Sequence, residues 1–230
     1  MSRNSRNAFI ALLLLVPAQS IATIVFYWFF DTAAGKISVA VLRVWIVLMP
    51  LLWLKLVDRE KASWSPPKLG GFGIAIVLGV AISVSIFAAF AIATHFGAIQ
   101  SDKIAGSAAR TGLNHLSAFI IGAIYWITLN SLAEEYVWRW FVFRKFEILI
   151  GGKLAVVAAA LAFTSHHVIV LAAQFNWLIT LAGSLGVFTG GAIWSWLYLR
   201  YRSIWPGYVS HAIVDATIFV IGYCLIFRGH

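Results

Sequence analysis

Residues Glu134–Arg139 read EEYVWR, and they place two neighbouring carboxylates and a guanidinium inside a stretch that is otherwise apolar. A charge at the centre of a bilayer costs at least about 2.5 kcal/mol, so ionisable groups within a membrane span are functional candidates. On a helix, residues four apart share a face, whereas neighbours are turned by about 100°. We therefore expect Glu135 to pair with Arg139, while Glu134 points elsewhere and stays available for chemistry. The plain alternative is an ion cluster at a helix end.

The composition around this stretch is that of a membrane protein. The chain has 230 residues, of which 62% are hydrophobic and only 11% are charged, and its mean hydropathy is +0.91. Apolar runs of about 18 residues or more recur along it, which is the length that a membrane-spanning helix needs. The single cysteine, Cys224, excludes an internal disulfide. We therefore predict an all-α fold, a polytopic membrane helix bundle in a single domain over residues 1–230.

Seven apolar segments are long enough to cross the membrane. The first follows Arg3 and Arg6 and extends well beyond the apolar part of a signal peptide, so we interpret it as a retained helix. A polar loop with Pro66-Pro67 and a longer polar connection over residues 95–114 separate the early spans. The expected helices are Ala8–Phe30, Ile37–Val57, Gly71–Thr94, His115–Ile150, Leu154–Ala173, Trp177–Tyr198 and Trp205–Phe227. Residues 1–114 then form N-terminal helices of uncertain role, and residues 115–227 form the candidate catalytic core.

The net charge of +9 indicates basic loops at an anionic membrane surface, and no nucleic-acid partner is expected. If the N-terminus is cytoplasmic, only Lys36, Lys103, Arg110 and Arg228 lie on the outer side, and Arg43 lies within a span. The inner side then holds Arg3, Arg6, Lys55, Arg59, Lys61, Lys68, Arg139, Arg144, Lys145, Lys153, Arg200 and Arg202. This bias predicts an integral membrane protein of the plasma or inner membrane, with a cytoplasmic N-terminus and an outer C-terminus.

Two further spans carry polar residues at helical spacing. Phe163 and His167 lie four apart in one span, and His211 and Asp215 lie four apart in another, so each pair shares a helix face. A lone histidine in a helix is usually a hydrogen-bonded packing residue. Two histidines, an aspartate and a glutamate pair on three spans instead indicate a site built from inward-facing side chains.

Neighbours of these residues are assigned by the same geometry. Asn130 lies one turn before Glu134 and adds a polar group to the face of that carboxylate. His166 is adjacent to His167 and should point away from it, so we assign it to packing or to a supporting position. Gly186 and Gly190 form a small-xxx-small face suited to close helix packing.

Taken together, these residues resemble the three ordered motifs of the CPBP family, the CAAX-protease and bacteriocin-processing intramembrane endopeptidases, also called the Abi family. The resemblance covers roughly residues 115–220, and the stretch Ser203–Gly207 is similar to the usual lead into the third motif. Asp215 stands where many relatives have asparagine, a variation that the family pattern admits. The matching residues are Glu134-Glu135-x-x-x-Arg139, Phe163-x-x-x-His167 and His211-x-x-x-Asp215.

The resemblance implies hydrolysis of a peptide bond in or near the membrane. Such a reaction needs an activated water, stabilisation of the oxyanion and a proton for the leaving amine. Glu134 suits the role of base, with His167 helping to hold the water, and the resemblance gives oxyanion stabilisation to His211 and the residue four after it. Because an ionised Asp215 cannot donate a hydrogen bond, we expect it to orient His211 instead. The ion pair between Glu135 and Arg139 would be a fixed support for these residues.

If the chain is such a protease, the alternative to a metal-free mechanism is a metal-dependent one. Glu134, His167 and His211 could supply the two histidines and one glutamate of a zinc hydrolase. The sequence has no H-E-x-x-H, and a glutamate beside an arginine is a poor zinc ligand. We therefore favour a glutamate-type protease without a cofactor, with zinc as the possible exception.

Two other functions stay open. A proton-coupled transporter would also place Glu and His within the membrane, although the chain shows no inverted repeat of short broken helices. A non-proteolytic membrane immunity or scaffold protein of the same family would tolerate loss of Glu134. The expected partners are the lipid bilayer and a membrane protein or lipidated peptide substrate, whose identity the sequence does not give.

Overall fold

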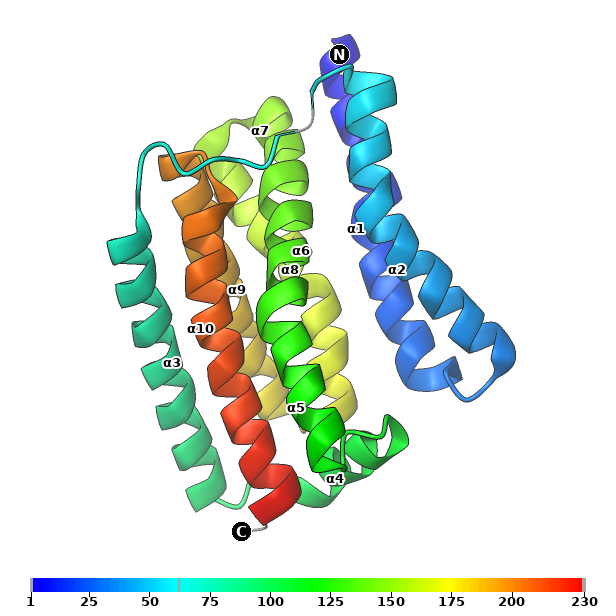
Figure 1. The fold of residues 1–230 in the computed structure, drawn as a ribbon, viewed down its shortest axis with the longest axis vertical. Helices are drawn as coiled ribbons and strands as arrows, with labels where there is room; N and C mark the ends of the chain where they lie inside the picture. The colour runs from blue at the N-terminus through cyan, green and yellow to red at the C-terminus, as the bar shows by residue number, and fades with distance from the viewer. Residues whose placement is uncertain (1, 62, 229–230) are drawn as a thin grey trace.

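The computed structural model describes residues 2–61 and 63–228, and these residues form helices and loops without a β-strand. Seven helical segments are long and apolar enough to cross a membrane, as the sequence predicts. Figure 1 shows them as a bundle in which α1 begins at one end and the C-terminal turn ends at the opposite end. The chain is an integral, all-α membrane protein.

The first three spans lie on two sides of the bundle. The antiparallel pair of α1 (Arg3–Phe29) and α2 (Ala33–Trp53), extended by the π-helical turn η1 (Leu54–Asp58), flanks one side, and α3 (Phe72–His95) packs on α10 at the other. A Cβ at Gly79 would lie 3.0 Å from the carbonyl oxygen of Ser210, so this glycine permits the close approach of α3 to α10. The loop between α2 and α3 crosses the end of the bundle (Figure 1).

The connection after α3 differs from the expectation, because it contains a helix, α4 (Ser101–Arg110). This helix is short and rich in small residues, and only Ala108 is buried, so its apolar pattern is weak. The Arg110 side chain donates a hydrogen bond to the carbonyl oxygen of Phe26 at 3.2 Å, which attaches α4 to the end of α1.

The fourth span is one helical segment that continues from Leu116 to Ile150. At 1.5 Å per residue its 35 residues extend about 50 Å, more than the roughly 30 Å hydrocarbon core, so one end reaches beyond it. Its parts are α5 (Leu116–Tyr125), η2 (Trp126–Asn130), α6 (Ser131–Glu135), η3 (Tyr136–Phe143) and α7 (Arg144–Ile150). The π-helical segments η2 and η3 therefore lie on either side of α6, which carries Glu134 and Glu135, and π-helical turns are frequent at functional sites.

Three helices complete the core. Gly151, at φ 80°, ends α7 and precedes α8 (Gly152–Gln174), which packs closely on α9 (Trp177–Tyr201). The predicted packing face at Gly186 and Gly190 is not the one that meets α8: a Cβ at Gly186 would meet nothing within 4 Å, and the nearest atoms to one at Gly190 belong to Trp194 on the same helix. Close approaches to α8 occur at Gly183 and Gly191, where a Cβ would lie 3.0 Å from the Leu171 side chain and 3.1 Å from the Phe163 ring.

The last span, α10 (Ile204–Tyr223) with the turn η4 (Cys224–Arg228), is fixed at its start by the loop between α2 and α3. The Ser203 hydroxyl donates to the carbonyl oxygen of Ser65 at 2.7 Å, and the Ile204 amide donates to the Ser65 hydroxyl at 3.1 Å. The Trp205 indole also donates to the carbonyl oxygen of Trp64 at 3.0 Å. These bonds set the depth at which the polar residues of α10 lie.

Candidate active site

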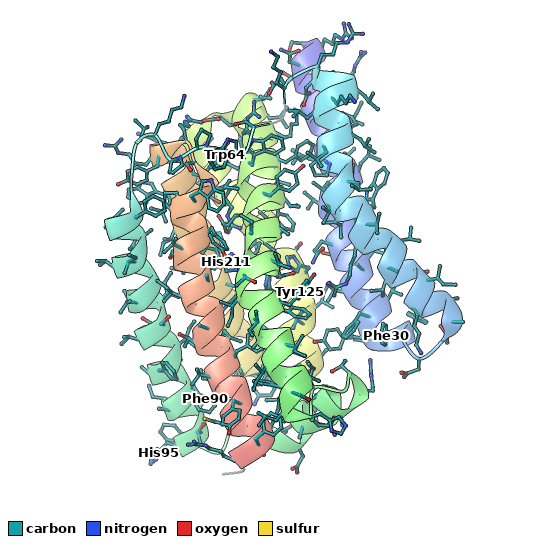
Figure 2. All side chains as sticks on the ribbon, viewed as in Figure 1. Phe30, Trp64, Phe90, His95, Tyr125 and His211 are labelled. Atoms are coloured by element: carbon teal, nitrogen blue, oxygen red, sulfur yellow. The ribbon has the colours of Figure 1, made fainter. Side chains whose placement is uncertain are left out.

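The predicted site residues come together from three spans, with the two glutamates on α6, His167 on α8, and His211 and Asp215 on α10. Figure 2 shows His211 inside the bundle, nearer to Trp64 at one end than to His95 at the other. The expected clustering of polar side chains on facing helices is therefore present in the structure.

The Glu135–Arg139 pair has the expected i,i+4 geometry. Arg139 Nη1 lies 3.0 Å from Glu135 Oε1, and both side chains are almost fully buried. The direction of this contact is poor for a hydrogen bond, and none of the three Arg139 nitrogens makes one with any residue that the structure describes. The guanidinium carbon instead lies 4.6 Å from the centre of the Phe163 ring and 5.0 Å from that of Trp194. Coulombic and cation–π attraction therefore hold this cation.

Glu134 is the more accessible of the two carboxylates. Its side chain is 19% exposed, whereas that of Glu135 is 0% exposed. Asn130 Nδ2 donates a hydrogen bond to Glu134 Oε1 at 3.0 Å, so Asn130 lies where the helical spacing places it. Glu134 Oε2 lies 3.7 Å from His211 Nε2. One oxygen of Glu134 is thus held by its own helix, and the other faces the histidine of α10.

His167 is oriented by the backbone of its own helix. Its Nδ1 lies 3.0 Å from the carbonyl oxygen of Phe163, so Nδ1–H donates this bond and Nε2 is left as an acceptor in the neutral ring. The ring is partly exposed, and it lies within electrostatic range of Glu134 and His211. Phe163 has two roles here, since its carbonyl orients His167 and its ring packs beside Arg139.

His166 differs from its expected orientation. Its ring centre lies 4.1 Å from that of His167, and the ring stacks on Trp138 at 5.4 Å, so the two histidines touch although they are neighbours on the helix. His166 is buried, and within the described part of the chain its Nδ1 has no hydrogen-bond partner. The packing role expected for it agrees with this stacking, but the ring does not point away from His167.

His211 is also oriented differently from the expectation, in which Asp215 holds its ring. His211 Nδ1 lies at hydrogen-bond distance, 3.0 Å, from Glu135 Oε1, whereas Nε2 is 3.8 Å from Asp215 Oδ1, too far for a hydrogen bond. Asp215 Oδ2 instead accepts a hydrogen bond from the Ser131 hydroxyl at 2.6 Å. Glu135 therefore orients His211 as well as facing Arg139, and Asp215 is held by α6.

Several residues of the site were not identified from the sequence. The Trp194 ring stacks on His211 with centres 3.9 Å apart, and its Nε1 donates to the Ser210 hydroxyl at 3.1 Å. Ser131 is fully buried beside Asp215. A Cβ at Gly207 would lie only 2.5 Å from Glu135 Oε2. The position of Ser131, one turn before Glu135, was a usable signal, but nothing distinguishes Trp194 among 11 tryptophans.

The possible zinc ligands do not form a metal site in this arrangement. Among the described residues, no group of three or more His, Cys, Asp and Glu side chains is placed to hold a metal ion. Glu134 and His211 are neighbours, but the other nitrogen of His211 faces Glu135, and Arg139 brings a positive charge to the same cluster. A cation there would be opposed by this guanidinium, so the donor set fits zinc poorly.

Fold and site together define a polytopic membrane protein with a carboxylate–histidine cluster enclosed by its spans. Residues 116–217 match the protein family described as Type II CAAX prenyl endopeptidase Rce1-like. The matched segment contains all three motifs, and the match supports an assignment to the CPBP/CAAX protease family. Comparisons with curated proteins and with solved structures gave no match.

Proposed function

We propose that the chain is an intramembrane endopeptidase of the glutamate type, whose substrate is a membrane-embedded protein or a lipidated peptide. The observation that carries this proposal is the 3.7 Å approach of Glu134 Oε2 to His211 Nε2, which joins a candidate base on α6 to a candidate oxyanion donor on α10. The family of residues 116–217 supports a protease. In this proposal residues 115–227 are the catalytic core, and residues 1–114 complete the membrane domain.

The water is held by two acceptors. Glu134 offers its free carboxylate oxygen, and His167 offers Nε2 because its Nδ1–H is engaged by the Phe163 carbonyl. A water that donates one hydrogen bond to each keeps an oxygen lone pair free to attack a carbonyl carbon. Glu134 takes the water proton as the C–O bond forms, and it later gives that proton to the leaving amine as the C–N bond breaks. No net proton is gained or lost by the enzyme.

In this mechanism His211 stabilises the oxyanion of the tetrahedral intermediate. A ring that donates Nδ1–H to Glu135 needs a second proton to donate from Nε2, so the active form is the imidazolium. Three carboxylates lie within 4 Å of this ring and supply its counter-charge. Removing a preorganised donor of this kind typically lowers the turnover number by a factor of about 10²–10³.

The burial pattern supports this division of roles. Glu134, His167 and Asp215 keep part of their surface exposed, as groups that meet water or substrate must. Glu135, Arg139 and Trp194 are buried behind them and contact His211 or its partners. In the proposed mechanism Asp215 positions the α6–α10 contact through Ser131, and Glu135 is the residue that orients His211.

Substrate trapping with a Glu134→Gln variant tests the function. The variant keeps the shape of the side chain but loses the base, so it should bind substrate without cleaving it. Glu134→Gln should retain a membrane peptide that the wild type releases as two fragments. Recovery of the same intact peptide from both proteins would favour a non-proteolytic binding protein, and proton-driven uptake that depends on Glu134 would favour a transporter.

A further inference from the structure

A polar cavity lies at the end of the bundle where α1 begins, apart from the candidate active site. It has a volume of about 270 Å³ and is formed by the first turns of α1, by η1 with the residues after it, and by η3 with α7. Four cationic side chains line it, one from α1, one from the residue that follows η1 and two from α7: Arg3, Arg59, Arg144 and Lys145.

The acidic side chains of this cavity neutralise only half of these cations. Glu60 Oε2 lies 2.8 Å from Arg144 Nη2, and Asp58 pairs with Lys145, whose side chain is only 7% exposed. Arg3 and Arg59 have no ion-pair partner among the residues that the structure describes. The cavity therefore keeps two uncompensated positive charges, and the amide groups of Asn4 and Asn7 on the same wall add neutral donors.

The cavity is also placed at a boundary between polar and apolar surface. Its lining combines charged side chains at helix ends with the apolar residues Leu54, Trp140 and Ile148. Leu54 and Trp140 are buried, but Ile148 is 48% exposed on a span that is long and apolar enough to cross the membrane. A ligand with a negative head and an apolar chain can contact both the unpaired cations and the exposed Ile148. A free anion would leave Ile148 uncovered.

We propose that this cavity binds the phosphate headgroup of an anionic phospholipid, with Arg3 and Arg59 as the unpaired cations that contact the phosphate. Basic pockets between membrane helices at the headgroup level bind such lipids. The bound headgroup would join α1 and η1 to η3 and α7. Because η3 directly follows Glu135, the lipid would stabilise the helix that carries the acidic pair.

The test compares two double variants of equal charge. Arg3→Gln with Arg59→Gln removes the two unpaired cations of the cavity. Arg6→Gln with Lys55→Gln removes two exposed cations of the same elements, α1 and η1, that do not line it. Melting temperatures are measured in detergent with added phosphatidylglycerol, with phosphatidylcholine and with inorganic phosphate, and lipid retained on the protein is counted by native mass spectrometry.

Phosphatidylglycerol should raise the melting temperature of the wild type and of the Arg6/Lys55 control by roughly 2–4 °C, as expected for a ligand that binds only the folded state. The Arg3/Arg59 variant should lose at least half of this rise and retain fewer lipid molecules. Equal loss in both double variants, or in neither, would overturn the site. An equal rise with phosphatidylcholine or with inorganic phosphate would overturn the assignment to an anionic lipid.

Discussion

The long helical segment from Leu116 to Ile150 carries two charged regions that the fold treats in opposite ways. In the middle of the segment, Glu135 and Arg139 are buried, and the arginine nitrogens make no hydrogen bond among the described residues. In α7, Arg144 and Glu147 lie near the end of the bundle and bond to acidic or basic partners at 2.8 Å with their side chains partly exposed. Lys145 of the same helix also pairs with an acidic residue, Asp58, although both side chains are mostly buried. The pairs of Arg144 and Glu147 are therefore well bonded and partly exposed, whereas the middle of the segment holds a buried charge pair beside a histidine.

This contrast has an energetic consequence. An exposed ion pair typically contributes about 0–1 kcal/mol, because water and salt screen it. Breaking a buried pair by removing one partner costs roughly 3–5 kcal/mol, because the other charge is left uncompensated. The two regions should therefore respond differently to the same chemical change, which the following variants test.

The largest effect on stability is expected from Glu135→Gln, which leaves Arg139 without its counter-charge in the core. The free energy of unfolding should fall by roughly 3–5 kcal/mol, seen as a lower melting temperature and yield in detergent. Replacing Glu135 by leucine together with Arg139 by methionine removes both charges, so it should recover part of the stability but not the activity. A Glu135→Gln protein as stable as the wild type would show that Glu135 and Arg139 are not energetically coupled.

A smaller effect is expected from filling the space beside Glu135. In Gly207→Ala the new methyl group would lie 2.5 Å from Glu135 Oε2, so the carboxylate must move from its contacts with Arg139 and His211. Overpacking of this kind costs about 1–3 kcal/mol, and cleavage should fall with it. The control is Gly186→Ala, also within a helix, where nothing lies within 4 Å of the new atom. Equal melting temperatures for the two variants would contradict the close contact.

At the end of the bundle the expected effect is smaller still. Arg202 bonds Glu147 through both terminal nitrogens, at 2.8 and 2.9 Å, but its side chain is 52% exposed. Arg202→Gln should change the free energy of unfolding by no more than about 1 kcal/mol and leave cleavage unchanged. The measurement is the melting temperature of Arg202→Gln, determined in parallel with that of Glu135→Gln. A loss as large as that of the buried pair would remove the distinction between the two regions.

No effect is expected from removing metal ions. If Glu134 activates the water without zinc, exhaustive chelation should leave the cleavage rate of the purified protein unchanged, and its zinc content should be substoichiometric. If activity is lost with a strong chelator and restored by zinc, the mechanism is metal-dependent and the glutamate-type mechanism is wrong. Inhibition by excess zinc decides nothing, since a Glu/His cluster can take up zinc adventitiously.

The sequence predicted the spans well because their signal is strong and local. All seven apolar segments correspond to helices that end within a few residues of the predicted bounds. Helix α4 was missed because its ten residues are mostly small or polar and only one is buried. The glycine face of α9 was misplaced because small-residue spacing does not tell which side of a helix meets its neighbour. Gly191 rather than Gly186 lies against α8.

Within the site, contacts along one helix were predictable and contacts between helices were not. Spacing of four residues was enough to anticipate the Glu135–Arg139 pair and the bond from Asn130 to Glu134. The partner of His211 depends on how α6 and α10 are rotated against each other, which is a property of packing. The 3.0 Å contact with Glu135 therefore replaced the expected one with Asp215.

In the proposed mechanism the two adjacent glutamates have different roles, with Glu134 as the base and Glu135 as the support. The most direct measurement is cleavage of the peptide recovered by trapping, beside melting temperature, for Glu134→Gln and Glu135→Gln in parallel. Glu134→Gln should lower the cleavage rate by about 10²–10⁴ with a melting temperature close to that of the wild type. Glu135→Gln should lower both. The opposite result is an unstable Glu134→Gln variant together with a well-folded but inactive Glu135→Gln variant. It would contradict the assignment of Glu134 as the base and Glu135 as the support, and the two roles would be exchanged.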